Sequence, residues 1–96
     1  MLMIRRIVGD SMLPGLYPGT LVFGLRWPKR LKVGQVVILR HRGTEKIKRI
    51  TRLDHRQVFV EGDNPGYSTD SRQFGWLDEP AIRAVVFWPR TKAKAG

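Results

Sequence analysis

Cysteine is absent from this chain, and histidine occurs only twice, as His41 and His55. Without cysteine, disulfides, thiolate zinc sites and cysteine nucleophiles are all excluded. The two histidines are isolated from each other, and His55 lies in the polar stretch RLDHRQ, where a solvated role is expected. The composition therefore predicts no metal site and no cofactor, and a serine enzyme built on this chain would be short of histidine, its usual base.

Long apolar runs are also lacking. The longest stretch without a charge is 11–25, and it contains two prolines and three glycines, which excludes a membrane-spanning helix there. The N-terminal MLMIRRIV has neither the long apolar region nor the small-residue cleavage site of a signal peptide. We therefore expect a cytoplasmic protein, with a peripheral position at a membrane as the alternative.

Acidic residues are scarce relative to basic ones, with 8 Asp and Glu against 18 Lys and Arg and a formal net charge of +10. Such a balance favours an acidic protein, an anionic membrane surface or nucleic acid as partner. The basic residues are spread along the chain without interleaved aromatic residues, so nucleic acid is not the expected partner.

With 96 residues, the chain has room for one core, and we expect a single domain over 1–89 followed by a frayed basic tail over 90–96. Short β-rich runs alternate with turn residues, and no helix of ten or more residues is indicated. The expected fold is mainly β, a small curled antiparallel sheet or barrel-like domain. Strands are expected over 3–8, 20–25, 36–42, 45–53, 57–63 and 81–88, with irregular structure over 64–75.

Three short segments combine reactive side chains with turn residues: GDSMLP from Gly9, KIKR from Lys46 and the run 62–72. Taken alone, Ser11 beside glycine and proline is most simply a turn residue. A lysine buried against apolar side chains could be neutral and so act as its base. Lys46 and Lys48 both qualify, because residues two apart lie on the same face of a strand.

In this order, GDSMLPGLYPGTLVFG, KIKRI and EGDNPGYSTDSRQFG resemble the three characteristic boxes of the signal peptidase I family of serine/lysine proteases. The resemblance spans about 9–75 and implies a Ser/Lys dyad that cleaves peptide bonds by acyl transfer. It also implies a role for each matching residue: Ser11 as nucleophile, Lys48 as general base, Ser68 as the residue that orients the base, Asp63, Arg49, Asp70 and Arg72 in supporting ion pairs, and Met12 and Pro14 as shaping residues beside the nucleophile.

The sequence departs from the family at Gly9, where many members carry a serine or threonine that helps Ser11 N–H to hold the oxyanion. The compact, helix-free chain with its EGDNPGYSTDSRQFG stretch resembles the nickel-type superoxide dismutase maturation proteases most. This resemblance implies a precursor with an N-terminal extension as substrate. The alternatives are leader processing by another signal-peptidase-like enzyme at a membrane surface, a LexA-like self-cleaving domain, for which too few residues precede Ser11, and a non-enzymatic basic β-barrel that binds nucleic acid.

Overall fold

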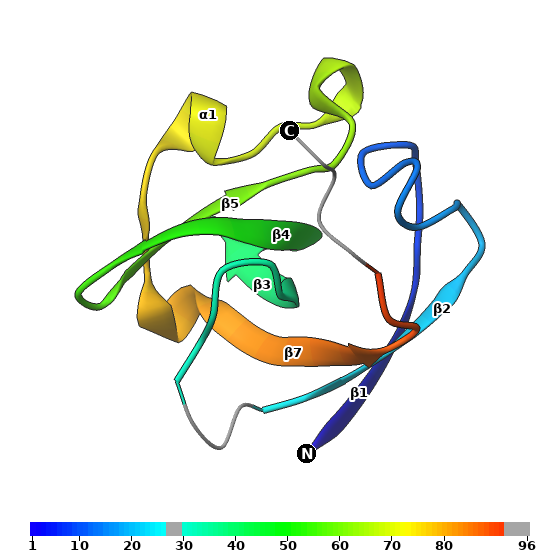
Figure 1. Ribbon diagram of the computed structural model, residues 1–96, viewed down its shortest axis with the longest axis horizontal. Helices are drawn as coiled ribbons and strands as arrows, with labels where there is room; N and C mark the ends of the chain where they lie inside the picture. The colour runs from blue at the N-terminus through cyan, green and yellow to red at the C-terminus, as the bar shows by residue number, and fades with distance from the viewer. Residues whose placement is uncertain (27–29, 92–96) are drawn as a thin grey trace.

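A seven-stranded antiparallel sheet makes up most of the molecule (Figure 1). The computed structural model describes residues 1–26 and 30–91. Of the expected tail, 92–96 lies outside the described residues. The strands and short helices are β1 (Leu2–Arg6), β2 (Leu21–Leu25), β3 (Val36–His41), β4 (Thr44–Asp54), β5 (Gln57–Glu61), η1 (Pro65–Tyr67), α1 (Ser71–Phe74), β6 (Leu77–Asp78), η2 (Glu79–Ala81) and β7 (Ile82–Trp88).

The strand order is β1-β2-β7-β3-β4-β5-β6, which leaves β1 and β6 as the two edges of a curled, unclosed sheet. The expected mainly β, curled antiparallel fold is therefore confirmed, without closure into a barrel. No helix among the described residues is long and apolar enough to span a bilayer.

The strands expected from the sequence are all present, with shifted ends. The first is shorter than expected: it ends at Arg6, and Ile7 instead exchanges backbone hydrogen bonds with Thr20 and Gly19 at the return of the following loop. The segment 64–75, expected to be irregular, contains η1 and α1. Helix α1 has only four residues and begins with a capping box between Asp70 and Gln73.

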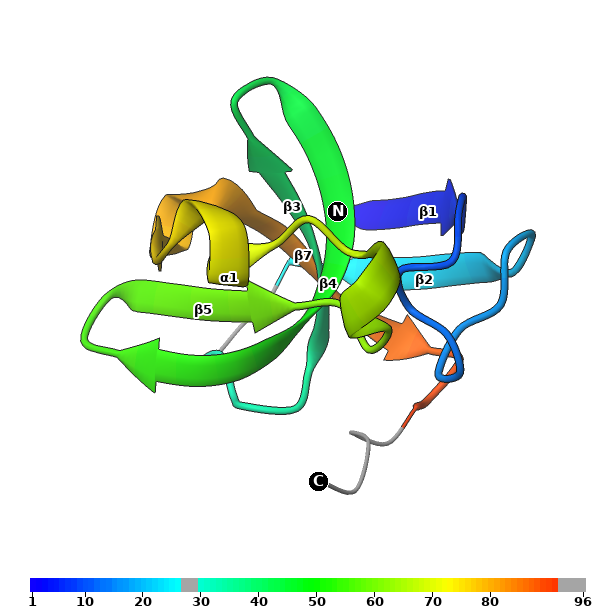
Figure 2. The same cartoon turned by 90° about the horizontal axis from the view of Figure 1, so that it is seen from above.

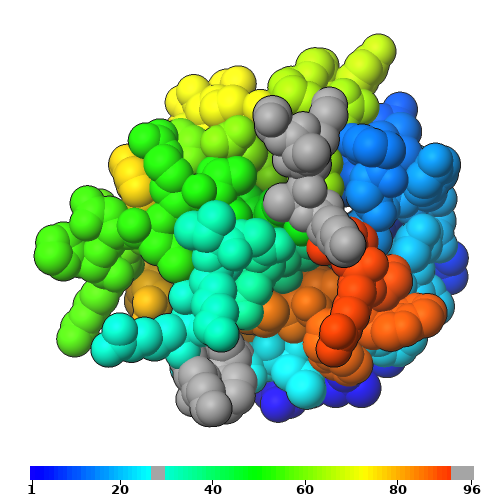
Figure 3. Space-filling model, in the orientation of Figure 1, coloured from blue at the N-terminus to red at the C-terminus, as the bar shows by residue number. Residues whose placement is uncertain are grey.

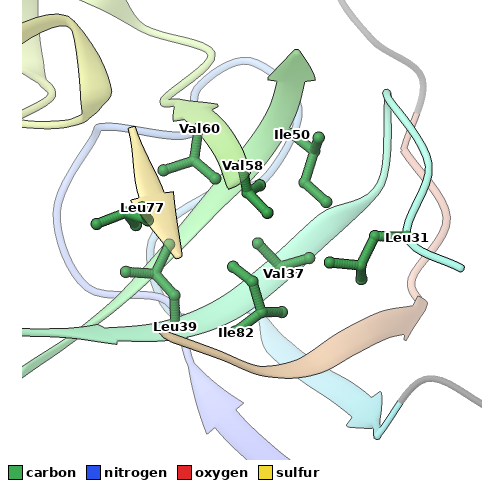
Figure 4. Close-up of a cluster of buried hydrophobic side chains, with 8 residues drawn as sticks. All are labelled: Leu31, Val37, Leu39, Ile50, Val58, Val60, Leu77 and Ile82. Atoms are coloured by element: carbon green, nitrogen blue, oxygen red, sulfur yellow. The ribbon is translucent and has the colours of Figure 1, made fainter. Parts of the chain in front are cut away.

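The larger core cluster is built from side chains of β3, β4, β5, β6 and β7 and of the loop before β3 (Figure 4). Its members are Leu31, Val37, Leu39, Ile50, Val58, Val60, Leu77 and Ile82. A second, smaller cluster consists of Ile7, Met12, Leu16, Val22 and Val36. Since Val36 and Val37 are neighbours in β3, the strand has apolar contacts on both faces and lies at the centre of the molecule.

Candidate active site

Ser11 lies on a loop, residues 9–19, that connects β1 to β2 and is called the serine loop below. The loop is fixed by its apolar side chains: Met12 is 1% exposed and Leu16 3%, and both pack into the smaller core cluster. Leu16 N–H also donates to Met12 O, 2.9 Å away. Burial of a methionine is worth about 1.5–3 kcal/mol, so Met12 anchors the backbone beside the half-buried Ser11.

The segment 62–72, called the clamp segment below, holds the serine loop from outside the sheet. Asn64 N–H donates to Ser11 O over 2.8 Å, and Asn64 Nδ2 donates to Asp10 O over 3.0 Å. Figure 2 shows the turn of η1 beside the serine loop, and in the space-filling view the blue and yellow-green atoms of the two segments lie close together at the upper right (Figure 3). The position of Ser11 therefore depends on residues far away in the sequence.

Lys48 lies on β4 and is 5% exposed. Its Nζ donates to Ser68 Oγ over 3.0 Å, and Ser68 Oγ in turn donates to Asp70 Oδ2. No carboxylate forms an ion pair with Lys48 among the described residues. The amine is thus buried and held by a neutral hydroxyl, an unusual environment for a lysine.

The charge of Asp70 is engaged by other groups. Arg72 Nη2 donates to Asp70 Oδ2 over 2.6 Å and Arg72 Nε to Oδ1 over 3.0 Å, while Gly62 N–H donates to Oδ2 over 2.8 Å. Burial raises the pKa of Asp70, but the hydrogen bonds from Arg72, Ser68 and Gly62 outweigh it and hold the pKa well below its usual range. Asp70 is therefore an ionised carboxylate that positions Ser68.

The environment of Lys48 favours the neutral amine. Burial is the largest influence and lowers its pKa from 10.5; the negative charge of Asp70 opposes this, and the positive charges of Lys46 and Arg72 lower the pKa further. Among the charges that shift this pKa, only that of Asp70 stabilises the ammonium form. Arg72 forms an ion pair with Asp70 and partly offsets this effect. Burial thus moves the pKa of Lys48 in the direction that a general base requires.

Arg49, the next residue on β4, forms a buried ion pair with Asp63 of the clamp segment. Arg49 Nε donates to Asp63 Oδ1 over 2.9 Å and Nη2 to Oδ2 over 2.8 Å, and the two side chains are 3% and 6% exposed. The guanidinium also donates to Gly34 O and to Thr91 Oγ1. This bidentate pair fastens the clamp segment to the strand that carries Lys48.

A cleft of about 280 Å³ is lined by both Ser11 and Lys48, with Lys46 beside them. Ser11 and Lys48 line the same cleft, but no hydrogen bond joins Ser11 Oγ to Lys48 Nζ within the described residues. Met12 also lines the cleft, whereas Pro14 is exposed and is not among the lining residues. Of the other residues singled out in the sequence, Ser68, Asp70 and Arg72 are linked to Lys48 by hydrogen bonds. Arg49 and Asp63 form the neighbouring ion pair.

Two residues that shape the site matched the third box in the sequence without a role of their own. Asn64 ties the clamp segment to the serine loop, and a Cβ on Gly62 would collide with Ser68 Oγ and with Ser11 O. The signal for Gly62 was its place in the matched EGDNPGYSTDSR stretch, but its close approach to Ser11 is a tertiary contact. Within the described part of the chain, no three His, Asp or Glu side chains gather closely enough to hold a metal ion.

Comparison with known families matches residues 1–86 to the family described as Peptidase S24-like. Comparison with curated proteins finds no match. The family match supports a serine peptidase family in general. It does not distinguish the signal peptidase I type or the nickel superoxide dismutase subgroup within it. It covers most of the chain, including every residue of the site described above except Thr91. The chain therefore belongs to the Peptidase S24-like family of serine peptidases.

Proposed function

We propose that the protein is a serine endopeptidase in which Ser11 is the nucleophile and Lys48 the general base. The observation that carries the proposal is the environment of Lys48: a buried amine, hydrogen-bonded to the hydroxyl of Ser68, facing the same cleft as a serine. A lysine kept neutral by burial can accept a proton from a hydroxyl, which a solvated ammonium cannot.

The donor directions fit this role. Because Ser68 gives its hydroxyl hydrogen to Asp70, its oxygen accepts an N–H from Lys48. A neutral amine that donates one N–H to Ser68 keeps its lone pair for the hydroxyl hydrogen of Ser11. Asp70 and Ser68 are therefore positioning residues, and they aim the lone pair of Lys48 into the cleft.

In the proposed reaction, Ser11 Oγ attacks the carbonyl carbon of the scissile peptide bond while its proton passes to Lys48 Nζ. The tetrahedral intermediate collapses as the ammonium of Lys48 returns the proton to the departing amine, which leaves an ester on Ser11. Water, deprotonated by Lys48, then hydrolyses the ester. Ser11 N–H donates no hydrogen bond to a described residue and supplies one oxyanion contact; with no side chain on Gly9, the second comes from a backbone N–H or water.

Two strand edges border the cleft and provide a place for the substrate backbone. β1 pairs only with β2, and the ladder between β4 and β5 begins at Arg49, so the earlier part of β4 pairs with β3 alone. The cleft is lined by residues of both strands, including Arg5, Arg6, Ile47 and Lys48. An extended peptide in this slot would hydrogen-bond to either edge and pass Ser11, as in β-strand addition.

For the substrate, we propose a precursor protein from which an N-terminal leader is removed, with the nickel superoxide dismutase precursor as the first choice. Support for this choice is the resemblance of 62–72 and the short separation of Ser11 from Lys48 in a compact chain. The S24-like match favours one further possibility, cleavage of the peptidase's own chain. A third possible function is leader removal at an anionic membrane surface, which the net positive charge of the chain favours.

The test incubates the purified protein with such a precursor and sequences every new N-terminus. We expect one new N-terminus at the leader junction with the wild type and none with Ser11→Ala. The intact mass of the peptidase is followed in parallel: its conversion at a rate per molecule that does not depend on its concentration would establish self-cleavage instead. Equal cleavage by wild type and Ser11→Ala would refute the assignment of the nucleophile.

Gly62→Ala is expected to impair catalysis through the geometry of the site. The added methyl would collide with Ser68 Oγ, with Ser68 Cβ and with the backbone oxygen Ser11 O, so rotation of the Ser68 hydroxyl alone cannot relieve the collision. Displacement of either by about 1 Å should lower kcat/KM about a hundredfold. Gly66→Ala is the matched control in the same segment, since a Cβ there meets nothing within 4 Å. Equal activity of the two variants would show that Gly62 does not set the position of Ser11.

A further inference from the structure

A second hollow of about 780 Å³ adjoins the cleft and is rich in arginine. Four arginines line it, Arg5, Arg26, Arg40 and Arg83, against two acidic residues, Glu45 and Glu79. They come from separate parts of the sheet: β1, the end of β2, β3 and β7. Positive groups that converge on a concave surface raise the local potential above that of the same charges on a convex one.

The hollow and the cleft share one wall, the ion pair between Arg5 and Glu45. Arg5 Nε donates to Glu45 Oε2 over 2.6 Å, and both residues line both spaces. This pair accounts for one arginine and one glutamate. Within the described residues, Arg26, Arg40 and Arg83 form no ion pair, so the hollow keeps a net positive charge even with Glu79 in its lining.

The register of the sheet gives the distance from the reacting centre. Arg40 is the cross-strand partner of Glu45, which lies three residues before Lys48 on β4. An extended peptide rises about 3.3 Å per residue, so a peptide lying along β4 from Lys48 would reach the hollow about three to six residues from its scissile bond. Because side chains alternate along a strand, Glu45 and Arg40 lie on the face of the sheet opposite to Lys48, so the hollow would take the side chains that a peptide in the slot points to that face.

We propose that this hollow is a subsite for acidic side chains of the substrate, located about three to six residues from the scissile bond. The proposal rests on the proposed function, because it takes the cleft to be the peptide slot. Guanidinium groups bind carboxylates through paired N–H donors, which suits aspartate or glutamate in an extended peptide. Nucleic acid fits less well, because the hollow opens into a slot bordered by two strand edges, which match a peptide backbone.

The test compares two pairs of peptides with one cleavage sequence. In the first pair, one peptide carries two acidic residues at positions three to six before the scissile bond, and the other carries Asn and Gln at the same positions. In the second pair, the same substitutions stand at positions three to six after the scissile bond. We expect wild-type kcat/KM to be about three- to tenfold higher for one of the acidic peptides at low salt, and the ratio to fall towards one as salt rises.

Arg40→Gln combined with Arg83→Gln should abolish this preference. Arg30→Gln combined with Arg56→Gln removes the same charge from exposed residues on another part of the surface and should keep it. An equal kcat/KM for acidic and neutral peptides in the wild type would overturn the subsite, and so would a preference that survives the loss of Arg40 and Arg83.

Binding to the Ser11→Ala protein, measured by anisotropy of the labelled peptides, tests the subsite without catalysis. Tighter binding of the acidic peptide that depends on Arg40 and Arg83 would support the subsite even if no peptide were cleaved, in which case the proposed function alone would fail. A short single-stranded oligonucleotide of equal charge is the competing probe. If it binds through Arg40 and Arg83 while the acidic peptide binds no better than the neutral one, the hollow is a nucleic-acid site and the proposal is wrong.

Discussion

Lys48→Met is expected to lower kcat/KM for peptide cleavage about a thousandfold while leaving the protein folded, because a general base contributes 10²–10⁴-fold. Methionine has nearly the volume of lysine and no charge to bury, so the free energy of unfolding should stay the same or rise. Lys48→Arg keeps a long basic side chain, but the guanidinium stays protonated and cannot accept the proton of Ser11, so this variant should be as inactive as Lys48→Met.

Lys46→Ala is the comparison that assigns the base. Lys46 also lines the cleft but is only half-buried, and its removal should cost far less activity than that of Lys48. Loss of cleavage in Lys46→Ala with activity retained in Lys48→Met would reverse the assignment. Circular dichroism and urea unfolding of each variant would show whether a lost activity reflects chemistry or folding.

The pH profile of the wild type provides an independent measurement. Burial lowers the pKa of Lys48 from 10.5, and only the neutral amine accepts the proton of Ser11. Activity should therefore be low when the amine is protonated, rise with pH through the pKa of Lys48, and level off below the pH at which an exposed lysine titrates. A rising limb centred on the ordinary lysine pKa would mean that the base is solvated and is not Lys48.

The strands were predictable because their sequences are locally consistent. Val36–His41 and Gln57–Glu61 are rich in β-branched and aromatic residues and are bounded by turn residues. β6 has two residues and gives no period to detect. Helix α1 escaped detection because it has only four residues, although the Asp70-to-Gln73 spacing of its capping box was visible in the sequence.

Lys46 and Lys48 are equivalent candidates for the base in the sequence alone. Alternation places both on one face of β4, and nothing near them in the sequence says which is covered. The covering residue is Ser68, whose position depends in turn on Asp70 and on the clamp segment. Burial, and hence the pKa of the base, is a tertiary property, and the resemblance to known proteases was needed to favour Lys48 before the fold was seen.

Asp63→Ala is expected to lower the free energy of unfolding by about 3–5 kcal/mol, because it leaves the buried guanidinium of Arg49 without its carboxylate. A domain of this size has a total stability of about 5–15 kcal/mol, so the loss is a large share of it. Urea unfolding measures the change, and an unchanged dependence on urea concentration would show that the unfolded state is the same. Asp54→Ala is the matched control, since the Asp54 side chain is 67% exposed, and it should cost under about 1 kcal/mol.

The position of the Arg49–Asp63 pair ties stability to catalysis. A Cβ on Gly15 of the serine loop would collide with Asp63 Oδ2, so the loop lies directly against the pair. Removing the carboxylate therefore loosens the serine loop and the clamp segment together, and activity should fall even under conditions where the variant is folded.

Arg49→Met combined with Asp63→Leu removes both charges and should recover part of the stability. It should recover less of the activity, because an apolar pair cannot reproduce the bonds from Arg49 to Gly34 and Thr91. A loss below about 1 kcal/mol in Asp63→Ala would mean that water replaces the carboxylate and that the pair does not hold the site together.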